Sequence, residues 1–139
     1  MESVNFVLET LAEVLEIDRA SGRLVSFRPR SAPGQQMIVS AADHPVFVLQ
    51  YLDAAGEHQR LDSRAAGSFT ASAEEAGGET RVTLAWGRVG GRDLDVTATI
   101  RASRGAPKSR WGIRVRNGAG LRIVDVQFPF VVCPYDLGG

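Results

Sequence analysis

The sequence has little of what disulfide-bonded and metal-binding proteins require. Its 139 residues include one cysteine, Cys133, and two histidines, His44 and His58. A single cysteine excludes an intrachain disulfide framework and any zinc site built on several cysteines. The two histidines have neither the i,i+2 spacing of one strand nor the i,i+4 spacing of one helix turn, which metal-binding pairs use. We therefore predict no metal site and no cofactor.

The sequence also lacks net charge and long hydrophobic runs. Its 16 basic and 16 acidic side chains cancel, so no net field attracts nucleic acid or an anionic membrane. No hydrophobic run approaches the length of a transmembrane helix. The N-terminal MESVNFVLETLAEVLEID carries acidic residues where a signal peptide carries basic ones. We expect neither nucleic acid nor a membrane as a partner, and the cytoplasm is the default location.

Positive charge is nevertheless concentrated in residues 101–116. Such a stripe can line a nucleic-acid groove, but those grooves interleave aromatic side chains with the basic ones, and the basic face here has none. We interpret the stripe as the solvated face of a sheet whose basic residues have salt-bridge partners. Its members are Arg101, Arg104, Lys108, Arg110, Arg114 and Arg116.

What the sequence does have is strand patterning, most clearly in residues 110–129, RWGIRVRNGAGLRIVDVQFP. The first half alternates, with Trp111, Ile113 and Val115 on one face and arginines on the other. This is the period of a half-buried strand. Residues 117–120, NGAG, tolerate positive φ angles and allow the chain to turn back sharply. We therefore predict a hairpin here.

The predicted return strand of this hairpin changes phase along its length. Leu121 and Ile123 occupy the inner face first, and Val124, Val126 and Phe128 follow in the other phase. A phase change without a break predicts a β-bulge or a strand that is buried on both faces.

The rest of the chain repeats short alternating segments about every ten residues, separated by Gly, Asp, Asn or Pro. Residues 5–18 also fit a helical face, but the turn in residues 18–22 and the alternating residues 23–28 that follow favour strands. Short edge strands are expected at 37–40 and 58–63. No amphipathic helix interrupts the series, so we predict an all-β fold with little or no helix.

The predicted architecture is an antiparallel two-sheet β-sandwich that forms a single domain over residues 1–139. A closed barrel is the main rival, because strand spacing alone does not distinguish closure from stacking. The inward positions of the strands predict a core of Val25, Phe27, Phe47, Leu49, Val82, Leu84, Trp86, Leu94, Val96, Ile100, Trp111, Ile113, Val115, Val126 and Phe128.

No group of side chains points to catalysis. Asp93 and Asp95 share one strand face about 7 Å apart, within the roughly 5–10 Å that separates glycosidase carboxylates. They alternate with buried residues, however, and should point to solvent. The glycine-rich residues 87–91 precede a strand instead of the helix that a phosphate loop needs, so they predict a turn. Further carboxylates without a predicted partner are Glu74, Glu75 and Asp125.

The remaining candidates also have simple structural interpretations. His44 and His58 are interpreted as solvated surface histidines, and Cys133 as a small buried hydrophobic residue. Trp86 and Trp111 could stack on sugar rings if exposed, but both alternate with aliphatic residues and are expected in the core. We assign no catalytic residue, and no binding residue is identified.

Three stretches fit the pattern of a known family. They are LEIDRASGRLVSFRPR (residues 15–30), WGIRVRNGAGL (residues 111–121) and IVDVQFPF (residues 123–130). Together they resemble the N-terminal β-sandwich of large bacterial glycoside hydrolases, a galactose-mutarotase-like supersandwich that precedes a catalytic (β/α)₈ barrel. In that family the acid and nucleophile lie on the barrel, so the resemblance carries no catalytic residue onto this chain.

The resemblance implies a non-catalytic sandwich domain that acts as a scaffold or as one wall of the active-site cleft. Its expected partners are the catalytic domain of the parent chain and carbohydrate. A free-standing carbohydrate-binding module is the alternative, and a small mutarotase-type enzyme is a third reading that lacks an acid–base pair.

In relatives, the segment like residues 128–139 continues into further strands. The resemblance therefore implies a fragment of a longer protein, with apolar side chains and a strand edge left bare near residues 130–137. Bare edges and apolar patches recruit partners. We expect a homodimer through the C-terminal strand or the sheet face beside it.

Overall fold

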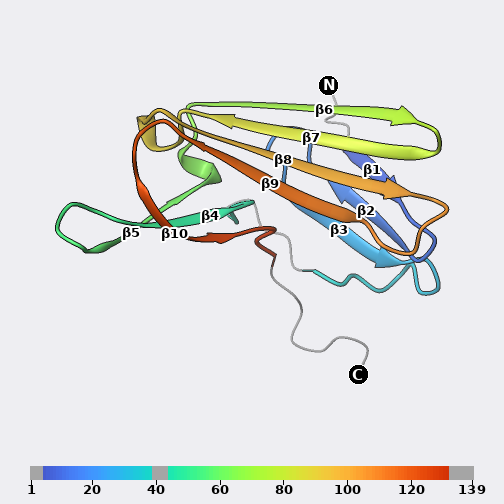
Figure 1. The fold of residues 1–139 in the computed structure, drawn as a ribbon. Coiled ribbons are helices and arrows are strands. Elements are labelled where there is room, and N and C mark those ends of the chain that lie inside the picture. The colour runs from blue at the N-terminus through green and yellow to red at the C-terminus, as the bar shows by residue number, and fades with distance from the viewer. Residues whose placement is uncertain (1–4, 39–43, 132–139) are drawn as a thin grey trace.

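A computed structural model describes residues 5–38 and 44–131, and these fold almost entirely into strands (Figure 1). The only helical elements in these ranges are two single 3₁₀ turns, η1 (Ser63–Ala65) and η2 (Val89–Gly91). No helix in the described ranges is long and apolar enough to cross a membrane. The strands are β1 (Phe6–Glu9), β2 (Glu13–Ile17), β3 (Leu24–Pro29), β4 (Val48–Leu52), β5 (His58–Asp62), β6 (Ser68–Ala76), β7 (Glu79–Gly87), β8 (Leu94–Ser103), β9 (Arg110–Asn117) and β10 (Arg122–Gln127).

The described strands form three antiparallel sheets arranged as a sandwich. A four-stranded sheet, β6-β7-β8-β9, makes one layer, and the sheets β1-β2-β3 and β10-β4-β5 lie against it (Figure 1). The predicted all-β antiparallel sandwich is confirmed, with one difference. The second layer consists of two separate three-stranded sheets instead of one continuous sheet.

The core fills the space between these layers. On β8, Leu94, Val96, Ala98 and Ile100 alternate with polar residues and are fully buried. This is what a strand with one covered face requires, because successive side chains point to opposite sides. The same cluster contains buried residues from β1, β2, β4 and β7. Those that the sequence pattern did not identify are Phe6, Leu8, Leu15, Ile17, Val46, Val89 and Ala102.

The ambiguous residues 5–18 form two paired strands, β1 and β2. Between them the hydroxyl of Thr10 accepts hydrogen bonds from the backbone N–H groups of Ala12 and Glu13, at 3.2 and 3.0 Å. A threonine side chain that satisfies backbone donors in this way stabilises a turn over a continuous helix. The preference for strands over a helix is therefore confirmed.

The turn between β2 and β3 is the predicted Asp-to-Gly turn. The N–H of Gly22 donates to the carbonyl of Asp18 at 2.7 Å, and Gly22 has a φ of 78°. A Cβ on this glycine would come within 3.1–3.2 Å of the side chains of Leu84, Phe69 and Trp86. Glycine is required here both for its backbone angle and for the space it leaves to the core.

The predicted hairpin over residues 110–129 is wrong. Among the described strands, β9 pairs with β8 and β10 pairs with β4, so the chain leaves one layer and enters the other. The NGAG segment does form a turn. The side-chain amide of Asn117 closes it, because it donates to the carbonyl of Leu121 at 2.6 Å and accepts from the N–H of Leu121 at 3.1 Å. The turn residues permit a reversal, but β4 supplies the partner that β10 actually takes.

The predicted β-bulge in this strand is present. The register of β10 against β4 shifts between Ile123 and Asp125, which makes Val124 the extra residue and keeps Ile123 and Val126 on the same face. Val126 is nevertheless 38% exposed, so its predicted place in the core is wrong. Among the described strands, β10 is an edge of its sheet, and Val126 lies on this edge.

A second bulge changes the predicted core on β3. The register against β2 shifts so that Ile17 pairs with Leu24, while Leu15 pairs with Phe27. Val25 is the extra residue, and the side chains that pack against the core are those of Leu24 and Phe27. The predicted place of Val25 in the core is therefore wrong, because the bulge interrupts the simple alternation that placed it there with Phe27.

The two predicted edge strands have different outcomes. β5 is an edge strand of its sheet, as expected. Residues 37 and 38 of the other segment do not form a strand, and the rest of it lies outside the described residues.

Candidate functional site

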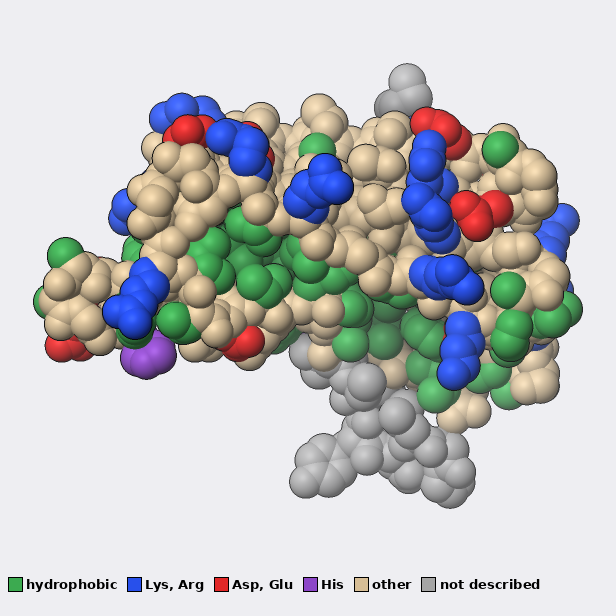
Figure 2. Space-filling view, in the orientation of Figure 1, with side chains coloured by type: hydrophobic (Ala, Val, Ile, Leu, Met, Phe, Trp, Pro, Cys, Tyr) green, Lys and Arg blue, Asp and Glu red, His purple; other side chains and the backbone are tan. Residues whose placement is uncertain are grey.

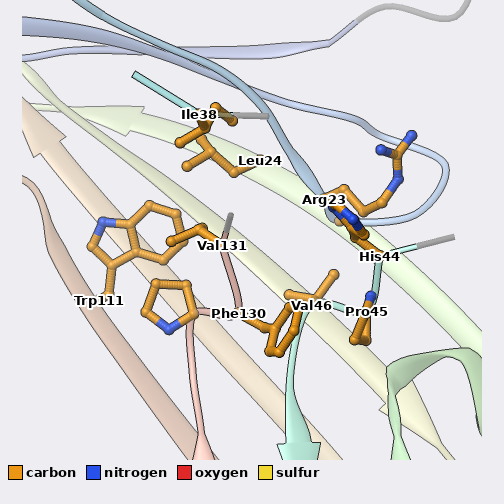
Figure 3. A pocket seen from close by; sticks show the side chains of 11 residues that line it. Arg23, Leu24, Ile38, His44, Pro45, Val46, Trp111, Phe130 and Val131 are labelled. Carbon is orange, nitrogen blue, oxygen red and sulfur yellow. The ribbon is translucent and has the colours of Figure 1, made fainter. Parts of the chain in front are cut away.

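The three stretches on which the expected family resemblance rests meet around one small cavity (Figure 3). Gly22 and Leu24 come from the first stretch, Trp111 from the second, and Pro129 and Phe130 from the third. Segments that lie about a hundred residues apart in the sequence thus pack against each other, as long-range pairing in sandwiches commonly requires.

This cavity is too small to be a sugar or cofactor site. Its volume is about 20 Å³, whereas a single water needs about 10–15 Å³ on the same scale. Its walls are mostly apolar, with His44 and Arg23 as the polar exceptions. The three stretches therefore pack together at this point without forming a binding site.

The two tryptophans differ in exposure. Trp86 is 2% exposed, and its ring packs edge-on against Phe47 with centroids 5.0 Å apart. Its predicted place in the core is confirmed. Trp111 is half-buried against the core, its ring lies 5.8 Å from that of Phe128, and its Nε1 donates to the hydroxyl of Ser109 at 2.9 Å. Neither is an open platform for a sugar ring.

The histidines and the cysteine do not form a site in the described ranges. His58 is exposed on β5, as predicted. His44 is half-buried in the wall of the cavity, so it is less exposed than His58. Cys133 lies outside the described residues. Within the part of the chain that the structure describes, no three His, Cys, Asp or Glu side chains gather as metal ligands would.

Asp93 and Asp95, the carboxylates considered as an acid–base pair, both bind one arginine. Arg116 Nε donates to Asp95 Oδ2 at 2.8 Å, and Arg116 Nη2 donates to Asp93 Oδ1. The hydrogen bond from Arg116, with a second from the N–H of Arg88, lowers the pKa of the Asp95 carboxyl, because both stabilise its charged form. An ionised carboxylate is not the proton donor that glycoside cleavage needs.

The other carboxylates considered are also on the surface. Glu74 pairs with Arg81 at 2.8 Å, Glu75 accepts from the hydroxyl of Thr80 at 3.3 Å, and Asp125 is exposed on β10. The glycine-rich residues 87–91 form a turn with the 3₁₀ element η2 and lead into strand β8, as predicted.

The basic stripe fits its interpretation only in part. Arg116 pairs with Asp93 and Asp95, and Arg104 pairs with Glu9 at 3.1 Å. The remaining basic residues of the stripe have no ion-pair partner among the described residues: Arg101, Lys108, Arg110 and Arg114.

The sandwich is well covered at β8 and open along β9 and β10. Ala98 and Ile100 on β8 are fully buried, whereas their neighbours Ile113 and Trp111 on β9 are only half-buried. Figure 2 shows hydrophobic side chains gathered along the side of the molecule between β9 and β10. We call this surface the open side, and it consists of Trp111, Ile113, Val115, Leu121, Ile123, Val126 and Phe128.

The fold and these side chains define a β-sandwich domain with one incompletely covered apolar side. No protein-family model matches the chain, and no curated protein has a matching sequence.

Proposed function

We propose that this chain is a non-catalytic β-sandwich domain of a glycoside hydrolase, in which the open side packs against a neighbouring domain. In this role the domain is a scaffold and can form one wall of the active-site cleft. The catalytic carboxylates lie on the neighbouring domain. The observation that carries the proposal is the open side itself.

The open side has the properties of an interface. Its members are all apolar, and they lie on or directly beside two strands, β9 and β10, that are edges of different sheets. Val126 is 38% exposed, and neighbouring Val124 is 47% exposed. Contiguous apolar surface beside unpaired strand edges is typical of surfaces that bind another domain or chain. A catalytic domain that follows β10 in the same chain would be close to this surface.

The glycoside hydrolase part of the proposal is supported by the three family-like stretches. Each of them contributes at least one residue to the small cavity beside Trp111, so parts of all three stretches pack together. This is support by analogy of fold, because the stretches contain structural positions only.

A free-standing carbohydrate-binding module is the second candidate. Buried Trp86 and half-covered Trp111 do not supply the aromatic platform that such modules commonly use. A sugar ligand would need polar recognition instead, and the outer face of the four-stranded sheet offers a surface of that kind.

Hydrogen exchange tests the scaffold role. The natural reading frame that contains residues 1–139 is expressed whole, and exchange at β9 and β10 is compared with that of the isolated chain, diluted until it is monomeric. We expect slower exchange at Val115 and Val126 in the whole protein, because a domain packed there removes water from both strands. Equal exchange at both residues, or a reading frame that adds no further domain, contradicts the proposal.

An activity screen tests the non-catalytic part. The purified chain should hydrolyse no chromogenic glycoside, because its paired carboxylates, Asp93 and Asp95, are both held by Arg116. Turnover that disappears in Asp93→Asn or Asp95→Asn would overturn this part of the proposal.

A further inference from the structure

The outer face of the four-stranded sheet carries a row of adjacent arginines that the scaffold role does not use. Arg81 on β7 pairs in register with Arg101 on β8, which pairs with Arg110 on β9. Glu74 on β6 neutralises only Arg81, at 2.8 Å. Like charges directly opposite each other on a sheet are unfavourable. Arg101 and Arg110 therefore form a surface where an external anion would be stabilised.

A shallow depression lies beside this arginine pair. Gly112 has no side chain. It lies opposite Thr99, two residues along the strands from the Arg101–Arg110 pair. Thr97, Thr99 and Gly112 line the depression, with Arg114 at its far end. The hydroxyls of both threonines make no hydrogen bond to another described residue, so they are available to a ligand.

The arginines at the two ends of the depression are far enough apart to contact one extended ligand. Arg110 and Arg114 point to the same face of β9 and lie four residues apart, which corresponds to about 13 Å from the rise of a strand. Arg114 also has no ion-pair partner among the described residues. Figure 2 shows basic side chains spaced over β8 and β9. Along these two neighbouring strands the surface thus presents guanidinium groups at both ends and the two threonine hydroxyls between them.

We propose that this outer face binds an acidic polysaccharide. Its carboxylate or sulfate groups would accept hydrogen bonds from Arg101, Arg110 and Arg114, since charge-assisted hydrogen bonds from arginine to anionic oxygens are strong. Its sugar hydroxyls would meet Thr97 and Thr99. We define the acidic-glycan face as these five side chains together with the gap at Gly112.

Other polyanions fit this face less well. Nucleic-acid sites without sequence preference stack bases on aromatic side chains, and the outward positions of β8 and β9 hold none between Asp95 and Arg116. A lipid surface favours apolar side chains among the basic ones, and the depression presents hydroxyls instead. A neutral polysaccharide would leave the arginines unpaired.

This inference goes beyond the scaffold role and does not rest on it. The acidic-glycan face is the outward face of β8 and β9, whereas the open side uses the inward residues of β9. Either proposal can therefore fail while the other stands.

The test is calorimetric titration of the purified chain at low salt with polygalacturonate, dextran sulfate and neutral dextran. We expect binding to at least one of the two acidic polymers and none to dextran, and the two acidic arms show whether carboxylate or sulfate is preferred. Binding should weaken as salt is raised, because the arginines are exposed and their attraction is screened. No binding to either acidic polymer overturns the proposal.

Matched double variants test the location. Arg101→Ala/Arg110→Ala should weaken binding by about tenfold, since it removes two charge-assisted contacts. Arg60→Ala/Arg122→Ala removes the same charge from exposed positions on β5 and β10, and it should leave affinity within about twofold. Equal losses in both double variants would show that net charge alone drives binding, and they would overturn the site.

A third variant fills the depression without removing an arginine. A Cβ at Gly112 meets no atom within 4 Å, so Gly112→Glu should fold normally. Its carboxylate would compete for the arginines and should weaken binding as much as the Arg101→Ala/Arg110→Ala variant. Unchanged binding in Gly112→Glu overturns the proposed location.

Single-stranded DNA tests the class of ligand. If it binds more tightly than either acidic polysaccharide, the ligand is nucleic acid and the polysaccharide proposal is overturned.

Discussion

β8 and β9 are neighbouring strands with the same alternating pattern and very different burial. The inward residues of β8, from Leu94 to Ile100, are fully buried. The inward residues of β9, from Trp111 to Val115, are half-buried although they stand directly beside them in the sheet. Alternation thus identifies which face of a strand turns inward, but it does not report how completely the opposite layer covers that face.

The cause lies in the second layer. β1 packs across from β7 and β8, and its Phe6 and Leu8 are buried there. Opposite β9, the closest ring is that of Phe128, which follows β10 and is itself only half-buried. β9 is also the edge strand of its sheet, so no further strand in the described ranges pairs with its outer side. The open side follows from these two facts.

The largest difference between the two regions should appear on removing a tryptophan from each. Trp86→Ala, on the covered side, should cost about 3–5 kcal/mol of unfolding free energy, as large aromatic deletions in cores do. Trp111→Ala should cost about half as much, because its side chain is partly exposed and buries less apolar surface than that of Trp86. Urea denaturation of both variants measures the difference. Equal costs would mean that β9 is as well covered as β7.

A pair of glycines gives a smaller contrast. Gly22→Ala should destabilise the fold by about 1–3 kcal/mol, because it forces a methyl group against Leu84 and Trp86 at a positive φ. Gly112→Ala, on the outer face of β9, should change stability by less than about 0.5 kcal/mol, since a Cβ there meets no atom within 4 Å. Thermal unfolding of both variants measures the difference in stability. A large loss of stability in Gly112→Ala would contradict the description of an open depression.

The smallest expected contrast is in the pH dependence of stability. Hydrogen bonds from Arg116 lower the pKa of Asp95 in the folded state. A lowered folded pKa contributes stability above the unfolded value, and this contribution is lost as the pH falls through the folded pKa. In the wild type, the urea midpoint should therefore fall as the pH drops below about 4. This fall should be smaller in Arg116→Gln. Arg114→Gln is the control, because Arg114 pairs with no described carboxylate, and an equal effect of both would refute the assignment.

The local part of the fold was accessible from the sequence. Alternating rows such as Val82, Leu84 and Trp86 identified strands and their inner faces, and the phase change after Ile123 identified a real bulge. These features depend on neighbouring residues, whose side-chain directions are fixed by the backbone. The bulge at Val25 left no phase change strong enough to reveal it.

The long-range part was not accessible. Residues 117–120 allow a tight reversal, yet β10 pairs with β4, which lies far away in the sequence, instead of with β9. Which strand pairs with which depends on the partners available after collapse, and turn residues do not encode it. The open side was missed for the same reason. The arginine row was recognised as a stripe, but its cross-strand register with Arg81 required the sheet.

The central claim is that the open side is completed by another protein surface. An isolated chain should then cover it with a second copy, because a two-fold arrangement is the commonest closed solution. Light scattering across a concentration series measures this, with Val126→Glu on the open side and Val7→Glu, at an exposed position of β1, as the matched control. We predict a mass that rises toward the dimer for the wild type and for Val7→Glu, and a monomer for Val126→Glu. A wild-type monomer at high micromolar concentration would contradict the account.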